Sequence, residues 1–322
     1  GVVATKNKEV TELDVERVLD AAKAVVIPSD REILHVLPQE FKVDNTRGIK
    51  DPVGMHGVRL EANVHIVTGQ TTLIQNLIRC VDQAGLVANE IILQPVASSK
   101  SVLSPEEKEL GVVLIDIGGG TTDIAVWKEN CLIWSQIIPV GGNHFTNDLA
   151  VGLKVTNDEA ERIKINHGSV LPEKVNDSSN ILVQGVSGIK PREVEIKYIS
   201  KILNARAEEL LGLVKRILEN NKLIDKMNAG FVITGGGALL NDLVPFAEYY
   251  LEKPVKVGYP VTFGGMTNVM EDPKLSTVLG LLLESKSEDE EYSEIEFGEN
   301  RPSEDVISKF SKSLKKVFKE IF

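Results

Sequence analysis

The sequence predicts an α/β fold, because short apolar runs alternate along the chain with segments of helical periodicity. The runs at 90–93, 112–115 and 231–234 are largely apolar, which is typical of buried strands. With 322 residues, the chain is long enough for two domains or for one two-lobed molecule. Hydrophobic residues make up 42% and charged residues 26%, so we expect a full core rather than disorder.

The other elements follow from local patterns. Thr11 can cap a helix, with Asp14 at the reciprocal acidic position, and apolar residues follow at helical spacing from Val15 to Val25. Alternation of apolar and polar residues predicts a half-buried strand over 58–66. The remaining predictions are a helix over 72–84, mainly helices from 157 to about 224 with a hairpin near 181–196, and a short buried helix over 276–283.

Composition excludes several classes of function. The net charge of −11 argues against binding of the bulk of the protein to nucleic acid or anionic lipid. Cys80 and Cys131 stand in no metal or redox spacing and read as reduced thiols, and five scattered histidines form no metal-ligand pattern. No signal peptide or membrane-spanning run is visible. Residues 1–4 resemble the middle of a strand, so we expect the chain to begin inside a domain.

The sharpest motif joins two strands through a glycine turn, Leu-Ile-Asp-Ile-Gly-Gly-Gly-Thr-Thr-Asp-Ile-Ala-Val at 114–126. Glycines let the backbone N–H groups approach a polyphosphate with no Cβ in the way. Thr121 and Thr122 add hydroxyl donors, Asp116 is placed to hold a hydrated Mg²⁺ ion, and Asp123 to do the same or to orient the turn. A glycine turn alone is as typical of a purely structural turn as of a phosphate site, but acidic residues on both sides favour the phosphate site.

Two weaker motifs lie farther along the chain. Thr-Gly-Gly-Gly-Ala-Leu-Leu at 234–240 predicts a strand that runs into a helix, whose N-terminus can face an anionic or polar ligand. A tight strand-to-helix turn is the plain alternative. Glu161 and Lys164 share one helix face, and the alternative for them is a solvent-exposed ion pair.

The C-terminal part changes character twice. Residues 284–305 carry ten acidic residues against Lys286 and Arg301, which predicts a flexible acidic tether. In 306–322 the apolar residues cover an arc of roughly 160° at about 100° per residue, with the lysines opposite. This pattern, with a net charge of +4, predicts a membrane-binding amphipathic helix; a helix docked on the protein's own core and a calmodulin-type target are the alternatives. The predicted membrane contacts are Ile307, Phe310, Leu314, Val317, Phe318, Ile321, Lys312, Lys315, Lys316 and Lys319.

Together, these motifs resemble the nucleotide site of the actin, Hsp70 and sugar-kinase superfamily, and within it the FtsA family. The runs at 35–41, 51–55 and 57–62 resemble the inserted domain of that family, and those at 94–98, 139–144 and 276–282 resemble its two lobes. The resemblance implies an actin-like two-lobed ATPase fold with an inserted domain in the first lobe. The implied parts are the inserted subdomain 1–62, the rest of the first lobe 63–111 and 276–283, the second-lobe core 112–155 and 227–275, the helical subdomain 156–226, the acidic linker 284–305 and the amphipathic helix 306–322.

The resemblance also implies binding of ATP and Mg²⁺, with at most weak ATPase activity. Gln94 would position the attacking water, and Asp116 would hold Mg²⁺ through water. The superfamily has two facing phosphate loops, and no first loop precedes Gly1, so we expect the opening strands, on the order of 80–100 residues, to be absent and nucleotide binding to be weak. The implied phosphate and Mg²⁺ residues are Asp116, Gly118, Gly119, Gly120, Thr121, Thr122 and Asp123, and the implied nucleoside residues are Glu161, Lys164, Gly235, Gly236, Gly237 and Ala238.

The function that the resemblance implies is that of a membrane adaptor in cell division. Such a protein anchors filaments of the tubulin-like FtsZ to the inner face of the cytoplasmic membrane at the division site. Its partners would be the FtsZ C-terminal tail, facing Arg206 and Glu209, further copies of itself, other division proteins and anionic lipid, but no nucleic acid. An exposed ion pair is the alternative for those two residues. An actin-like pilus-assembly adaptor and a small-molecule kinase of the same superfamily are the other functions considered.

Overall fold

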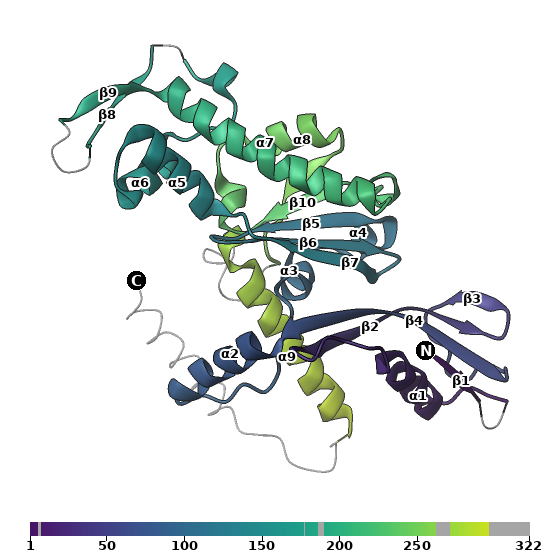
Figure 1. The fold of residues 1–322 in the computed structure, drawn as a ribbon. Helices are drawn as coiled ribbons and strands as arrows, with labels where there is room; N and C mark the ends of the chain where they lie inside the picture. Colours follow the sequence, from purple (N-terminus) through teal and green to yellow (C-terminus); the bar gives the residue numbers. More distant parts are fainter. Residues whose placement is uncertain (6–7, 177, 186–189, 262–270, 296–322) are drawn as a thin grey trace. The chain divides into compact units, whose positions relative to one another are not determined.

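A computed structural model describes residues 1–5, 8–176, 178–185, 190–261 and 271–295 of the chain (Figure 1). The chain divides into two compact units, Gly1–Leu282 and Leu283–Phe322. The first unit holds both large sheets and their helices. The second is described only as far as Ile295, where helix α9 (Ser276–Ile295) ends.

The N-terminal sheet is antiparallel, in the order β1-β4-β2-β3. Helix α1 (Glu12–Lys23) packs against it, burying Val18 with Phe41 and Leu60. Thr11 caps α1 and its N–H group donates to Asp14, so the predicted helix start is confirmed. The strands are β1 (Val2–Ala4), β2 (Arg31–Val43), β3 (Thr46–Ile49) and β4 (Arg59–Gln70).

The second sheet has the order β11-β10-β5-β6-β7, with β11, β10 and β5 parallel and the other two antiparallel. Figure 1 shows α7 and α8 on one side of it and α3 on the other. Strand β5 is buried on both faces: Ile115 belongs to the core under α7, and Leu114 to the core that includes Val102 of α3. The strands are β5 (Val112–Ile117), β6 (Thr122–Lys128), β7 (Cys131–Ile138), β10 (Phe231–Thr234) and β11 (Val255–Val257).

Helices dominate the region between β7 and β10, as predicted. They bury one apolar stripe each, for example Ala207, Leu211 and Val214 of the long helix α7. The predicted hairpin is also present, as β8 (Asn180–Val183) and β9 (Arg192–Glu195). The helices are α2 (Thr71–Gln83), α3 (Gln94–Val102), α4 (Pro105–Leu110), α5 (Gly142–Leu153), α6 (Asn157–His167), α7 (Ile196–Asn220) and α8 (Leu243–Leu251), with 3₁₀ turns η1 (Pro172–Lys174), η2 (Ile224–Lys226), η3 (Gly236–Leu239) and η4 (Pro273–Leu275).

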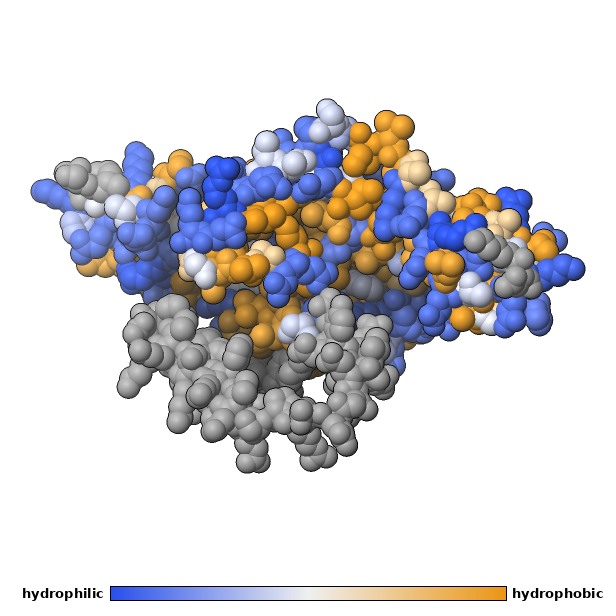
Figure 2. Space-filling view, turned by 90° about the horizontal axis from the view of Figure 1, so that it is seen from below, coloured by the Kyte–Doolittle hydropathy of each residue, from blue (hydrophilic) through white to orange (hydrophobic). Residues whose placement is uncertain are grey.

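The predicted strand at 90–93 is wrong, because this segment has no regular secondary structure. A strand needs a neighbouring strand to satisfy its N–H and C=O groups, and no strand among the described residues pairs with this segment. Among the described strands, β1 alone pairs with the outer edge of β4, at Arg59–Glu61. Helix α2 follows β4 directly and leaves Leu73 and Leu77 exposed, and Figure 2 shows apolar side chains on this side of the molecule.

The acidic segment also differs from its prediction. Helix α9 does not end near Leu283 but continues to Ile295, so the first half of the expected flexible tether 284–305 is helical. Glutamate favours helices, and no glycine or proline interrupts the sequence before Gly298. Nor is the start of α9 buried on all sides, since Val278 and Leu282 are exposed. Residues 296–322, with all the predicted membrane contacts, lie outside the described residues; among the described helices, none is long and apolar enough to cross a membrane.

Candidate functional site

The glycine turn between β5 and β6 lies against the N-terminus of helix α5. The N–H group of Gly118 donates to Thr121 O at 2.9 Å, which closes the turn. The first two N–H groups of α5, from Gly142 and Asn143, donate to the carbonyl groups of Gly118 and Gly119 at 2.8 and 2.7 Å. The carbonyl groups of Gly118 and Gly119 are thus occupied. The N–H groups of Gly119 and Gly120 make no backbone hydrogen bond within the described chain, the arrangement that binds anions.

Two carboxylates lie at the base of this turn, one on each of the strands that it joins. Asp116 and Asp123 face each other across β5 and β6, and each is only 2% exposed. Burial, with a smaller contribution from the charge of Asp116, raises the pKa of Asp123 to about 6. Two buried carboxylates side by side favour a nearby cation. No three histidine, cysteine or acidic residues gather in the described part of the chain, so Mg²⁺ would take most of its ligands from phosphate and water.

Asp116 is held from the α3 and α9 side by three donors. Ser98 Oγ donates to Asp116 Oδ2 at 2.5 Å, Gln94 Nε2 at 3.2 Å and Thr277 Oγ1 at 3.4 Å. Gln94 therefore lies beside Asp116, where its amide is hydrogen-bonded to that carboxylate, and it does not line the pocket described below. Its role in positioning a water molecule stays a prediction. Ser98 and Thr277 were not predicted; both lie in runs that resemble the family, Gln-Pro-Val-Ala-Ser and Ser-Thr-Val-Leu-Gly.

The two threonines of the turn differ. Thr121 is exposed, and its hydroxyl group lies 3.4 Å from Asp123 Oδ2. Thr122 is fully buried, and its hydroxyl group donates to Val140 O at 2.7 Å. The prediction that both threonines offer hydroxyl groups to phosphate is therefore wrong for Thr122, because its hydroxyl group ties β6 to the segment before α5.

The second glycine turn packs on the end of β5. Gly235 has φ +79° and ψ 174°, a conformation that is essentially limited to glycine. A Cβ atom there would lie 2.4 Å from Asp116 Oδ1, and one at Gly237 would lie 2.3 Å from Ile117 Cγ2. The predicted helix is wrong in its details: a four-residue 3₁₀ turn, η3, begins at Gly236 within the glycine run, and α8 begins only at Leu243. Ala238 is buried in the core, so its side chain supports the turn.

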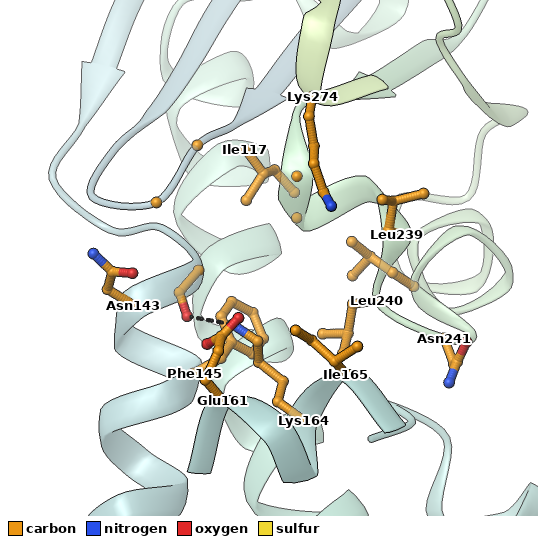
Figure 3. Close-up of a pocket in the computed structure, with 16 residues that line it drawn as sticks. Ile117, Asn143, Phe145, Glu161, Lys164, Ile165, Leu239, Leu240, Asn241 and Lys274 are labelled. Atoms are coloured by element: carbon orange, nitrogen blue, oxygen red, sulfur yellow. Dashed lines mark hydrogen bonds and ion pairs between the residues drawn. The ribbon is translucent and has the colours of Figure 1, made fainter. Parts of the chain in front are cut away.

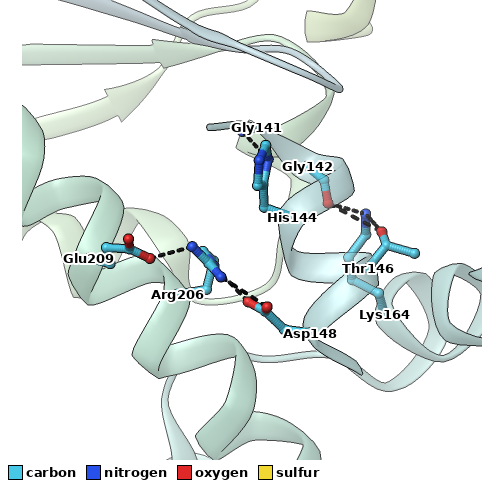
Figure 4. Close-up of polar contacts among 8 residues, drawn as sticks. All are labelled: Gly141, Gly142, His144, Thr146, Asp148, Lys164, Arg206 and Glu209. Atoms are coloured by element: carbon cyan, nitrogen blue, oxygen red, sulfur yellow. Dashed lines mark hydrogen bonds and ion pairs between the residues drawn. The ribbon is translucent and has the colours of Figure 1, made fainter. Parts of the chain in front are cut away.

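Glu161 and Lys164 lie on α6, which packs against α5; Figure 3 shows both side chains, and Figure 4 shows the lysine. Lys164 Nζ lies 2.7 Å from Glu161 Oε2 and donates to Thr146 Oγ1 at 2.8 Å and to Gly142 O at 3.2 Å. Its side chain is only 14% exposed, so the alternative of a solvent-exposed ion pair is wrong for the lysine. Burial acts to raise the pKa of Glu161, but hydrogen bonds from Lys164 and Thr146 hold it below its usual value.

These elements surround a pocket of about 260 Å³ (Figure 3). Glycines of both turns line one side of it and the Glu161–Lys164 pair lines another, so the structure brings the main predicted motifs together. Lys274 points into the pocket from the side opposite Lys164. An apolar slot with a few polar groups is typical of a site for a planar organic ligand. Lining residues that the sequence reasoning missed are Ile117, Gly142, Asn143, Phe145, Ile165, Leu239, Leu240, Asn241, Leu243 and Lys274.

Arg206 and Glu209 lie apart from the pocket, on helix α7 (Figure 4). They form the ion pair that was the alternative for them, but Arg206 has a second partner, Asp148 of α5. The Arg206 Nε–Asp148 Oδ2 and Arg206 Nη2–Asp148 Oδ1 distances are 2.6 and 2.9 Å. Beside them runs a groove of about 550 Å³, lined by Ala205, Glu208, Glu209, Gly212, Lys215, Arg216, Glu219 and Tyr250.

Comparison with known families gives two matches that together cover most of the chain. Residues 1–68 match the model of the SHS2 domain inserted in FTSA, and residues 113–280 match that of cell division protein FtsA. The chain belongs to the FtsA family. The cell division protein FtsA of Pseudomonas aeruginosa is 42% identical over 283 residues, which is 88% of this chain and 68% of that protein. FtsA of Escherichia coli K12 is 37% identical over 289 residues, covering 88% and 69%.

Solved structures show that the fold is actin-like. MreB5 of Spiroplasma citri bound to ADP superposes with a TM-score of 0.57 at 24% identity, over 71% of this chain and 69% of that chain. The PilM–PilN type IV pilus biogenesis complex gives a TM-score of 0.57 at 16% identity, over 88% and 74%. At these sequence identities, the likeness supports a shared fold and nothing about function. It is the match to FtsA models and relatives that separates the chain from the pilus-assembly adaptor considered above.

Proposed function

We propose that this chain binds ATP with Mg²⁺ in the pocket between the two glycine turns. The observation that carries the proposal is the continuity of an apolar pocket with the turn at Gly118–Gly120, where the N–H groups of Gly119 and Gly120 donate to no backbone carbonyl group in the described chain. The N–H groups would bind phosphate, and Asp116 would hold Mg²⁺ through water. Glu161 and Lys164 would contact the ribose or adenine beside the apolar lining.

Our proposal gives ATP a regulatory role with at most weak turnover. Mg²⁺ would neutralise the phosphate charge when bound. The one candidate for orienting a water molecule, Gln94, donates its amide to Asp116 and is absent from the pocket lining. The chain's own residues thus bind and orient the nucleotide more evidently than they assist its hydrolysis.

A titration of ATP·Mg²⁺ against the wild-type chain and an Asp116→Ala variant tests this site. We expect at least tenfold weaker binding in the variant, about 1.4 kcal/mol, because the carboxylate that would hold Mg²⁺ through water is lost. Asp20→Ala is a matched control, since Asp20 forms an exposed ion pair with Lys23 on α1. Equal affinities for wild type and Asp116→Ala would remove Asp116 from the site.

We further propose that the protein is a membrane adaptor of the division machinery. It would bind FtsZ filaments, associate with further copies of itself, and attach to the inner face of the cytoplasmic membrane through residues 306–322. Membership of the FtsA family supports the division role. The basic amphipathic pattern of the C-terminal segment supports membrane attachment, because lysines near an anionic surface contribute about 1 kcal/mol each.

The proposed contact for the FtsZ tail is the α7 surface around Arg206 and Glu209. The groove that begins beside Glu209 and carries charges of both signs supports this assignment, because it offers a peptide both ion pairs and the ring of Tyr250. We expect Arg206→Glu and Glu209→Arg to weaken an FtsZ tail peptide without unfolding the protein. Normal affinity in both variants would move the interface elsewhere.

A second measurement separates the adaptor from the small-molecule kinase. The adaptor should sediment with anionic liposomes and with FtsZ filaments, whereas a kinase of the same superfamily should do neither. Sedimentation with neither would sink the adaptor proposal even if ATP binds.

A further inference from the structure

Helix α5 contacts the phosphate-turn region at one end and Arg206 on the following turns. Its first residues, Gly142 and Asn143, donate to the carbonyl groups of the glycine turn. Asp148, five residues after Asn143, contacts Arg206. Five residues of α-helix rise only about 7.5 Å, and a helix of this length moves as one body. A displacement of the glycine turn would therefore also displace Asp148.

Asp148 occupies the side of Arg206 that a carboxylate prefers. Both oxygens of Asp148 accept from Arg206, at 2.6 and 2.9 Å, which is the bidentate geometry of a strong arginine–carboxylate pair. Glu209 takes a third N–H group, from Nη1. Two of the five guanidinium N–H groups remain, one on each Nη atom. Asp148 fills the Nε/Nη2 side of Arg206, so a partner's carboxylate can bind that side only by displacing Asp148.

The exposure of this pair allows such an exchange. The side chains of Arg206 and Asp148 are 21% and 25% exposed, so an incoming carboxylate can reach them. A fully buried pair would resist exchange because an uncompensated charge would be left in the interior. Once displaced, Asp148 can be solvated at the surface.

We propose that Asp148 is an internal competitor for Arg206, and that α5 makes the strength of this competition depend on nucleotide at the glycine turn. The proposal rests on the proposed function, in which Arg206 binds a peptide and the turn binds ATP. The ligand it concerns is a peptide that presents a carboxylate to Arg206. A purely structural role for Asp148, as a link between α5 and α7, is the competing explanation.

The test measures binding of an FtsZ C-terminal tail peptide to the full chain by fluorescence anisotropy, with and without saturating ATP·Mg²⁺. We expect Asp148→Asn to bind the peptide about fivefold more tightly than wild type. This factor corresponds to the free energy that an ion pair at or near the surface contributes. We expect the wild-type affinity to differ at least threefold between the two nucleotide conditions, and the variant affinity to be the same in both. Glu159→Gln, which removes the Arg162–Glu159 pair on α6, in which the glutamate side chain is 16% exposed, is the matched control and should behave as wild type.

Each other outcome counts against the proposal. Equal or weaker binding by Asp148→Asn, while Arg206→Ala loses binding, overturns the competitor and leaves the proposed peptide surface intact. Normal binding by Arg206→Ala overturns both. A wild-type chain that binds ATP but shows no nucleotide effect on the peptide overturns the coupling through α5, and a chain that binds no ATP overturns the proposed nucleotide site together with the coupling. Asp148→Ser replaces Asp148→Asn if urea unfolding shows that the latter does not fold.

Discussion

Replacing Gly235 by alanine should destabilise the protein severely, for two separable reasons. The backbone conformation there, φ +79° and ψ 174°, costs a residue with a side chain about 1–3 kcal/mol. The new Cβ would lie 2.4 Å from Asp116 Oδ1 and 2.6 Å from Ile117 O, and relieving such overpacking costs about 1–3 kcal/mol more. The free energy of unfolding should therefore fall by about 2–6 kcal/mol, which corresponds to roughly 5–20 °C in Tm for a unit of this size.

Gly120→Ala is the matched control, because a Cβ at Gly120 meets no atom within 4 Å and the backbone there lies outside the glycine-only region. Its unfolding free energy should stay within about 0.5 kcal/mol of wild type. Urea unfolding of the three proteins without nucleotide gives both values. If Gly235→Ala unfolds at the same urea concentration as Gly120→Ala, the strain assigned to the second glycine turn does not exist.

Three further perturbations test the carboxylate pair, the uncovered helix and the tail. The raised pKa of Asp123 means that the folded state favours its protonated form. The stability that this group contributes is therefore full below pH 3.8 and is lost as the pH rises through about 6. Asp123→Asn should be about 3 kcal/mol more stable than wild type at pH 7.5 and no more stable at pH 3.5, as urea unfolding can measure. On α2, Leu77→Ala should change stability by less than about 0.5 kcal/mol because Leu77 is exposed, whereas Ile74→Ala, one turn earlier and buried, should cost about 2–4 kcal/mol; equal losses in urea would contradict the packing of α2. Deleting residues 306–322 should abolish sedimentation with anionic liposomes without unfolding the protein, because the remaining charge is −11 minus +4, or −15, and Phe318→Glu should be nearly as damaging; a truncated chain that still sediments would show that the tail is not the anchor.

The sequence could predict the elements whose causes are local. The cap of α1 by Thr11 and Asp14 depends on residues three apart, and both glycine turns can be recognised from their runs of three glycines. The proximity of the two turns could be expected from topology, because β5 and β10 are neighbouring parallel strands that end at the same edge of the sheet. The family resemblance gave Glu161 and Lys164 a role at the nucleoside; their side chains line the pocket, and that role stays a prediction.

What the sequence could not give depends on contacts between distant segments. The 90–93 run has the composition of a strand, yet pairing depends on a neighbour, and local pattern carries no information about one. Lys274 enters the pocket from a turn more than 100 residues beyond Lys164, and no motif marks it. Asp148 is one acidic residue among 47 Asp and Glu, and its importance appears only when α5 and α7 are packed together.

The carboxylate pair connects the stability of the fold to the ligand proposed for it. Within the described residues, Asp116 accepts from three donors, whereas Asp123 has one long contact, to Thr121, and a pKa raised to about 6. Near neutral pH the fold therefore carries two neighbouring negative charges at the base of the glycine turn, at a cost in stability. A cation held there by nucleotide phosphates removes part of that cost, and a ligand that binds the folded chain alone stabilises it further by mass action. ATP·Mg²⁺ should accordingly raise the Tm of wild type more at pH 7.5 than at pH 5, and this pH dependence should be lost in Asp123→Asn. A Tm increase that is equal at both pH values in wild type would separate the carboxylates from the ligand site.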